Sequence, residues 1–203
     1  MKYIFSTVAI LITLSINCFS QKRDKENYEE LKFLVGQSVL NLQFDYQGMT
    51  VGEKPEQLYI EEKRDTKNSR AEGSGNKWEH DWEFNKNEDF PRRFTVLFNK
   101  HLAKKNLVVG KDSNAIYTLT VKTLRIEPGF HTGTLASSPA LADLEFIFTK
   151  TDEPEKVLCK LRIKGVEGSA GFASFDAGMR MQECYAKAGK ILASYIMDNA
   201  YKK

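Results

Sequence analysis

Two tryptophans spaced four residues apart are the first residues whose types could serve a binding function. Trp78 and Trp82 share one face of a helix if the segment around them is helical, because residues i and i+4 are neighbours on a helix surface. Paired tryptophans can stack on a sugar or a peptide, and large aromatics at this spacing also anchor a segment onto a hydrophobic core. Both interpretations stay open, and the pair is a candidate binding site.

A second candidate lies in residues 125–133, which read Arg-Ile-Glu-Pro-Gly-Phe-His-Thr-Gly. Pro128-Gly129 predicts a tight turn at the end of a strand, with His131 exposed near its tip. The turn either presents Phe130 and His131 to a ligand or simply ends the strand, with Phe130 packed back onto the core. Turn chemistry alone explains the Pro and the Gly, which favours the second interpretation.

A glycine- and serine-rich stretch at 165–178 supplies a third candidate. Its glycine spacing fits neither a phosphate-binding loop nor a dinucleotide-binding loop. We therefore expect a mobile loop or lid ahead of the last helix. Phe172 and Phe175 lie inside it, and exposed aromatic side chains in such a segment are candidates for contact with a partner.

No motif indicates catalysis, a metal ion or a cofactor. The sequence has no Gly-x-Ser-x-Gly elbow and no His-Glu-x-x-His pattern. We therefore expect no catalytic residues, no metal site and no cofactor. Catalytic triads assemble from residues that are distant in sequence. A hydrolase whose site gathers Glu, His and Cys side chains remains an alternative for that reason.

The N-terminal segment predicts export. Lys2 is followed by an uncharged, largely apolar stretch, and small residues at positions 18 and 20 fit a peptidase site after Ser20. We expect residues 1–20 to be a cleaved signal peptide and residues 21–203 to form one domain, periplasmic or secreted. Lipid attachment at Cys18 is an alternative, although a lipobox has a small residue where Asn17 stands.

Removal of that segment leaves two cysteines, Cys159 and Cys184. In an oxidising compartment they could form one disulfide. Because a disulfide needs a specific Cβ–Cβ geometry that no sequence supplies, two buried thiols are the alternative.

Composition narrows the range of partners. The chain has 203 residues and a net charge of +3, with Lys and Arg dispersed among Asp and Glu. A nucleic-acid-binding protein usually concentrates its basic residues in one stripe, so nucleic acid is not an expected partner. No segment after the N-terminal one has the apolar length for a membrane span.

The apolar periodicity predicts an α+β fold. Alternating patterns predict strands at 39–46, 117–126, 144–148 and 157–163, with a bulge near Thr123 and Leu124. Patterns of period 3.6 predict helices at 91–105, capped by Asp89, and at 177–199, capped by Asp176. Another helix begins at Pro55, and the Trp pair lies on a short one. We expect a two-layer sandwich, with helices packed on one face of a mainly antiparallel sheet.

Three short patterns carry a resemblance: Phe44-Asp45-Tyr46, the run 126–130 (Ile-Glu-Pro-Gly-Phe) and the run 185–190 (Tyr-Ala-Lys-Ala-Gly-Lys). With them the chain resembles a group of uncharacterised secreted bacterial envelope proteins. The order of elements from Phe90 to Asn199 more loosely resembles the small domain of curli-secretion and TolB N-terminal-type proteins. The resemblance implies a fold and an envelope location, and it carries no catalytic role.

The sequence therefore favours a non-enzymatic exported protein that binds an envelope partner or assembles with its own kind. A small-molecule or glycan-binding module is the first alternative. Its binding residues would be Trp78, Trp82, Phe130 and His131. The hydrolase described above is the second alternative.

Overall fold

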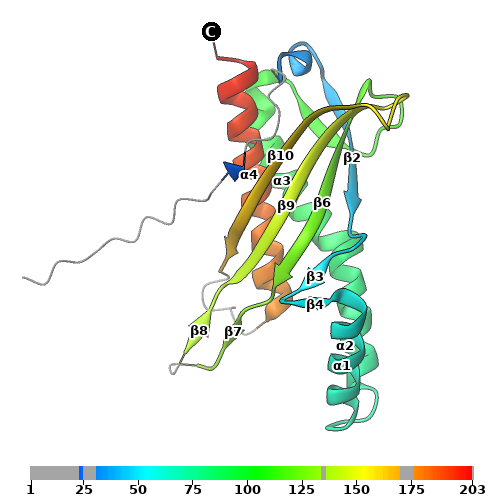
Figure 1. Ribbon diagram of the computed structural model, residues 1–203. Helices are drawn as coiled ribbons and strands as arrows, with labels where there is room; N and C mark the ends of the chain where they lie inside the picture. The colour runs from blue at the N-terminus through cyan, green and yellow to red at the C-terminus, as the bar shows by residue number, and fades with distance from the viewer. Residues whose placement is uncertain (1–22, 25–30, 134–135, 170–175, 203) are drawn as a thin grey trace, which may run out of the picture.

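The computed structural model describes residues 23–24, 31–133, 136–169 and 176–202 (Figure 1). The expected signal peptide, Cys18, Phe172 and Phe175 lie outside the described residues. In chain order the elements are β1 (Arg23–Asp24), η1 (Leu31–Leu34), β2 (Val39–Asp45), β3 (Thr50–Val51), β4 (Lys54–Pro55), α1 (Glu56–Asn68), α2 (Ser74–Phe84), η2 (Asn85–Asp89), α3 (Phe90–Leu102), η3 (Ala103–Lys105), β5 (Val108–Gly110), β6 (Tyr117–Glu127), β7 (Phe130–His131), β8 (Ser137–Ser138), β9 (Ala140–Lys150), β10 (Val157–Gly168) and α4 (Ala177–Ala200). The fold is α+β, as the sequence predicts.

The main sheet is mixed. Its strand order is β1-β10-β9-β6-β2-β5. The predicted antiparallel pairing holds for β6, β9 and β10, and the predicted bulge appears as a register shift between Thr123 and Arg125. By contrast, β2 pairs in parallel with both β5 and β6. The chain passes through α1, α2 and α3 between β2 and these strands, and such a long crossover returns the chain in the same direction.

Helices α2 and α3 form one uninterrupted helix through the five-residue π-helical segment η2. Asp89 has helical angles (φ −73°, ψ −42°), so the prediction that it caps a new helix was wrong. Buried side chains recur every fourth residue from Trp82 through Lys86 to Phe90 and on to Leu102. In a regular α-helix that spacing drifts by about 40° per step. The wider π turn of η2 offsets part of the drift and keeps the series facing inward.

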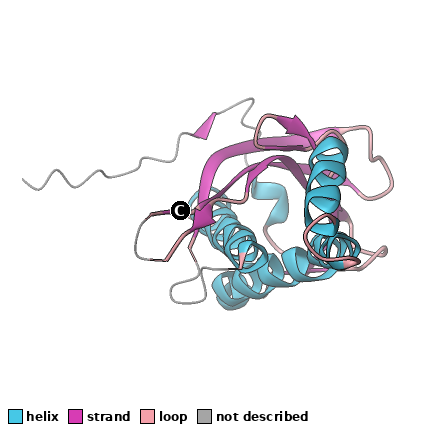
Figure 2. Cartoon of the chain, turned by 90° about the horizontal axis from the view of Figure 1, so that it is seen from below, coloured by secondary structure: helices cyan, strands magenta, loops and turns pink. Residues whose placement is uncertain are grey.

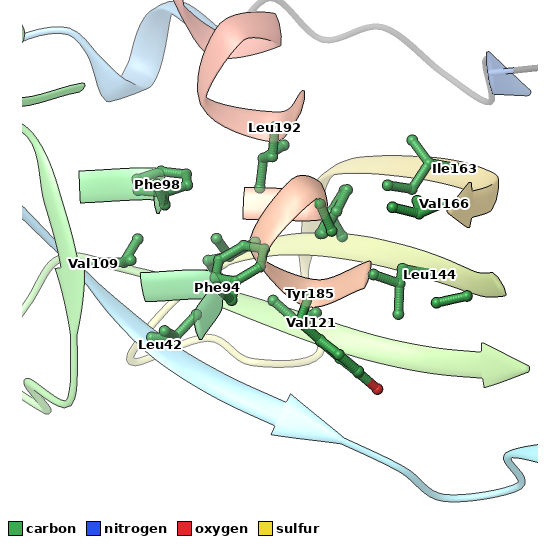
Figure 3. Close-up of a cluster of buried hydrophobic side chains, with 14 of the residues drawn as sticks. Leu42, Phe94, Phe98, Val109, Val121, Leu144, Ile163, Val166, Tyr185 and Leu192 are labelled. Carbon is green, nitrogen blue, oxygen red and sulfur yellow. The ribbon is translucent and has the colours of Figure 1, made fainter. Parts of the chain in front are cut away.

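The core lies between the sheet and helices α3 and α4, which pack against each other and against the same face of the sheet (Figures 1 and 2). Phe94 and Phe98 from α3 meet side chains from α4 and from the strands (Figure 3). The helices approach closely at Gly189, where an added Cβ would lie 2.4 Å from the carbonyl oxygen of Phe94. Any side chain at position 189 would therefore push the two helices apart.

Tyr185 joins both helices to the sheet. Its ring stacks on that of Phe90 at a centroid distance of 4.4 Å, and its hydroxyl lies 2.7 Å from Oγ1 of Thr123 on β6. Burial raises the pKa of Tyr185 above its ordinary value of 10.0. At the start of α4, the Asp176 carboxylate accepts a hydrogen bond from the Gly178 N–H (2.7 Å), which confirms the predicted cap.

The two cysteines are buried and are not joined by a disulfide, so of the two alternatives left open by the sequence the structure has the buried thiols. Cys184 lies against Gly168, where an added Cβ would be 2.6 Å from its sulfur. Cys159 lies nine residues earlier on the same strand. At about 3.3 Å per residue, the two positions on β10 are separated by roughly 25–30 Å. A disulfide requires Cβ atoms about 4 Å apart, so this fold cannot form the bond.

The face of the sheet away from α3 and α4 carries a row of alternating charges, which we call the charge ladder. One line of register across four strands aligns Asp45, Lys122, Glu145 and Arg162. Two neighbouring pairs form direct ion pairs, Lys122–Asp45 at 3.1 Å and Arg162–Glu145 at 2.8 Å. Opposite charges facing each other on adjacent strands stabilise a sheet, so the ladder supports this register.

Within the described ranges, none of the helices combines the length and the apolar composition that a membrane crossing requires.

Candidate functional site

Three parts of the chain meet at the lower end of the molecule in Figure 1. They are the α1–α2 pair, the turn between β6 and β7, and the start of α4. A pocket of about 600 Å³ opens between them. We call it the end pocket. Its lining residues are Tyr59, Lys63, Lys67, Trp78, Asp81, Trp82, Phe84, Asn85, Asp89, Pro128, Gly129, Phe130, Asp176, Ala177, Gly178, Arg180, Met181 and Gln182.

The α1–α2 pair forms one wall of the end pocket. Its two helices cross closely at Gly75, where an added Cβ would lie 2.1 Å from the carbonyl oxygen of Arg64. Glu56 at the start of α1 holds the other end of the pair. Its Oε1 accepts hydrogen bonds from the Trp82 indole N–H (2.8 Å) and from the Lys86 ammonium group (2.6 Å). These contacts fix the wall against the rest of the fold.

Three aromatic rings cluster on this wall. Tyr59, Trp78 and Trp82 have mutual centroid distances of 5.5–5.9 Å. Trp82 is only 3% exposed, so it serves mainly as the anchor that one interpretation of the pair predicts. Tyr59 and Trp78 are half-buried and line the pocket, and they present the aromatic surface that a ligand can reach.

The opposite wall is the turn at Pro128-Gly129. Gly129 has φ +64°, and an added Cβ would lie 2.3 Å from the carbonyl oxygen of Ser138. Only glycine combines this conformation with so close an approach. The turn leaves Phe130 51% exposed. The expectation that Phe130 packs back onto the core was therefore wrong, and its ring lines the pocket.

Arg180 holds this turn against α4. Its guanidinium donates hydrogen bonds to the carbonyl oxygens of Pro128 (3.1 Å) and Gly129 (3.2 Å). The side chain is 4% exposed, and burial lowers its pKa even though Asp176 acts in the opposite direction. A buried cation bound to two turn carbonyls is a positioning element, because it sets where Phe130 stands.

The floor of the end pocket is polar. The side-chain amide of Gln182 donates to Asn85 Oδ1 (2.7 Å) and to Asp89 Oδ2 (3.0 Å), both on η2. Its carbonyl accepts a hydrogen bond from Arg93 (3.3 Å). The π-helical segment thus turns polar side chains toward the pocket, a placement often found at functional sites.

A second pocket, of about 390 Å³, shares Phe130 and Arg180 with the end pocket. It is lined by Phe130, His131, Ser137, Ser138, Pro139, Glu167, Ser169 and Arg180. Here His131 lies opposite Ser137 in the β7–β8 pair. The His131 Nδ1 accepts a hydrogen bond from the Gly133 N–H (3.0 Å), so the neutral ring carries its proton on Nε2.

Trp78, Trp82 and Phe130 therefore share the end pocket, and His131 lies in the neighbouring one. Sequence reasoning missed Tyr59, Lys63 and Arg180. Arg180 and Gln182 did leave a signal, since both are polar residues on the otherwise apolar inner face of the last helix. Among the described residues, no group of three or more His, Cys, Asp or Glu side chains is arranged to hold a metal ion.

No protein-family model and no curated protein matches this chain. It is similar to the PelC dodecamer from Paraburkholderia phytofirmans, with a TM-score of 0.38 and 9% identity over 85% of this chain and 95% of that one. It is also similar to a candidate homolog of neuraminyllactose-binding hemagglutinin from Helicobacter pylori, with a TM-score of 0.40 and 10% identity over 88% and 95% of the two chains. Likenesses this weak support no conclusion about function.

Proposed function

We propose that this protein is an exported, non-enzymatic binding module that takes a small ring-bearing polar ligand, best fitted by a sugar, into the end pocket. The observation that carries the proposal is the meeting of Tyr59, Trp78 and Phe130 from three separate segments around a pocket of about 600 Å³. Ligand pockets of this size combine aromatic walls with a few polar groups that fix orientation. The proposal of export is supported by the N-terminal sequence pattern. The proposal of a two-layer sandwich is supported by the apolar periodicity.

The polar floor gives the pocket what a sugar requires. Asn85 donates one N–H to the Asp81 carbonyl and accepts a hydrogen bond from Gln182, which leaves its amide one N–H and one lone pair for a hydroxyl. The half-buried rings of Tyr59 and Trp78 offer flat surfaces to the apolar face of a pyranose. The rigid supports described above hold these groups in place, which lowers the entropy cost of binding.

Intrinsic fluorescence tests the proposal directly, because the two tryptophans in the sequence both line the pocket. We expect oligosaccharides from a panel to shift or quench the emission of the mature protein in a saturable way. Trp78→Ala should weaken that binding about tenfold, in line with stacking worth roughly 1–1.5 kcal/mol. Val96→Ala is the matched control, since Val96 is an exposed apolar residue on α3 away from the pocket. A panel that leaves the emission unchanged would overturn the proposal.

A protein partner, or a second copy of this chain, is the second candidate. Phe84 and Phe130 are each 51% exposed at the edge of the end pocket, and exposed aromatic residues are enriched at protein interfaces. Light scattering on the purified mature protein separates the outcomes. A stable oligomer that Phe84→Ser and Phe130→Ser dissociate would favour self-assembly, and a strict monomer would exclude it.

A further inference from the structure

We infer that the ligand of the end pocket is anionic, a sugar that carries a carboxylate, and that Lys63 and Lys67 select it. This inference rests on the proposed function. It follows from which charges around the pocket already have partners and which do not.

Each carboxylate that lines the end pocket is already engaged. Asp81 accepts a hydrogen bond from Lys77 (2.7 Å), and Asp89 forms an ion pair with Arg92 (2.6 Å). Asp176 caps the N-terminus of α4. Lys77 and Arg92 stand outside the lining, so they neutralise two acids without entering the pocket.

The two lysines that line the pocket differ from these acids. Lys63 and Lys67 lie one turn apart on α1, and among the described residues neither has an ion pair within 4 Å. Two acids beside them are occupied elsewhere, Glu62 on α1 by Lys54 and Glu79 on α2 by Arg64. Two like charges at i and i+4 repel slightly, so the helix gains nothing from this pair on its own.

A count of formal charges also indicates that the end pocket is positive. The lining has three cations and three carboxylates, and the partners Lys77 and Arg92 add two more cations. Even with Arg180 left aside, four cations stand against three carboxylates, so the end pocket and its immediate partners carry a positive charge. A cleft of one sign concentrates ligands of the opposite sign and orients them.

The position of the lysines sets the class of ligand. They share α1 with Tyr59, which faces Trp78 across the α1–α2 pair at 5.9 Å. A ring lying on these aromatic side chains would therefore have its substituents within reach of the ammonium groups. A carboxylate on a pyranose ring, as in a hexuronic acid, combines the two features that this wall recognises.

The test compares oligogalacturonate with its methyl ester, which keeps the ring and removes the charge. Tryptophan emission of the full mature chain reports binding of both probes. We expect the acid to bind about tenfold more tightly than the ester in low salt, with the preference shrinking in 0.5 M NaCl. In the double variant Lys63→Gln, Lys67→Gln the preference should vanish. Lys100→Gln, Lys104→Gln removes a lysine pair of the same sequence spacing, with Lys100 in the last turn of α3 and Lys104 in η3, and should leave the preference intact.

Each outcome decides one claim. Equal affinity for acid and ester, or a preference that survives Lys63→Gln, Lys67→Gln, overturns the anionic ligand and leaves the proposed function standing. A preference that Lys100→Gln, Lys104→Gln also abolishes identifies a nonspecific effect of net charge and overturns it as well. Absence of binding by both probes and by the whole neutral panel overturns the proposed function itself.

Discussion

The charge ladder and the end pocket use the same residue types in opposite ways. On the ladder, each charge faces an opposite charge on the next strand, and Glu145 is held by Arg162 at 2.8 Å and approached by Lys160 at 3.6 Å. In the end pocket, Lys63 and Lys67 have no such neighbour within the described ranges. Charges that satisfy one another stabilise a fold, whereas charges left over are available to a ligand. The comparison predicts that the two regions respond differently to substitution.

The largest expected effect on stability comes from the buried interior, which belongs to neither region and sets the scale for both. Burial raises the pKa of the Cys184 thiol to about 12 and raises the pKa values of Tyr46 and Tyr185 above their usual value of 10.0. Groups whose folded pKa is raised stabilise the protein fully below their unfolded pKa. Above pH 9 the free energy of unfolding should therefore fall, by about 1.4 kcal/mol per pH unit for each group that ionises on unfolding.

Urea denaturation between pH 8 and pH 11 measures this loss. Tyr185→Phe removes one ionising group and should make the decline shallower between pH 10 and pH 11. An unchanged slope in that variant would show that Tyr185 does not contribute.

Gly129→Ala should give the next largest effect, and it acts on the pocket side of the comparison. The added Cβ would lie 2.3 Å from the Ser138 carbonyl oxygen, in a backbone conformation that alanine adopts only with strain. We expect a loss of about 2–3 kcal/mol in the free energy of unfolding, together with weaker ligand binding. Gly133→Ala is the control, because it has a similar φ of +68° and open space around it. Similar losses in the two variants would contradict the role of the close approach at Gly129.

Glu145→Gln tests the ladder and should cost about 1 kcal/mol. The Glu145 side chain is 7% exposed, and its loss of charge leaves Arg162 without its ion-pair partner on β9. Glu153→Gln removes a carboxylate from an exposed surface pair with Lys150 and should cost almost nothing. Chemical denaturation measures both, and titration with the sugar should show unchanged affinity in both. A change in affinity in Glu145→Gln would contradict the claim that the charge ladder supports stability without affecting binding in the end pocket.

The smallest expected change in stability belongs to Lys63→Gln, Lys67→Gln. Neither ammonium group has an ion pair to lose among the described residues, so the free energy of unfolding should stay within about 0.5 kcal/mol of the parent value. A stabilisation within this range fits the removal of two neighbouring positive charges. A clear destabilisation would mean that the lysines support the fold and are not free for a ligand.

The pattern of neighbouring residue types was enough to predict the strands, bulges and caps that short stretches of sequence determine. The alternation in β6, its bulge after Thr123 and the Asp176 cap of α4 could all be read from residue types within a few positions of one another. The parallel pairing of β2 with β6 could not, because it depends on how far the intervening helices carry the chain. The separation of Cys159 and Cys184 depends in the same way on which end of β10 meets α4.

The candidate site was predictable only in part, for a related reason. Trp78, Trp82 and Phe130 stood out because large aromatic residues are conspicuous, but their meeting in one pocket is set by η2 and by the turn that Arg180 holds. Lys63 and Lys67 did not stand out, because lysines on the exposed side of an amphipathic helix usually face only solvent. What distinguishes them is that the three carboxylates of the pocket lining, together with Glu62 and Glu79, already have partners, and that is a property of the folded chain.

The π-helical segment η2 also lets the long helix change its length while keeping its buried face. A π turn takes about one residue more than an α turn, so deletion of the exposed Asn87 would let the helix continue in regular α geometry, with Trp82 and Phe90 seven residues apart on one face. Trp82, Phe94 and Phe98 would then keep their places in the core, whereas Asn85 and Asp89 would lose the π turn that presents them to Gln182. A deleted residue in this segment would thus alter the floor of the pocket and spare the core.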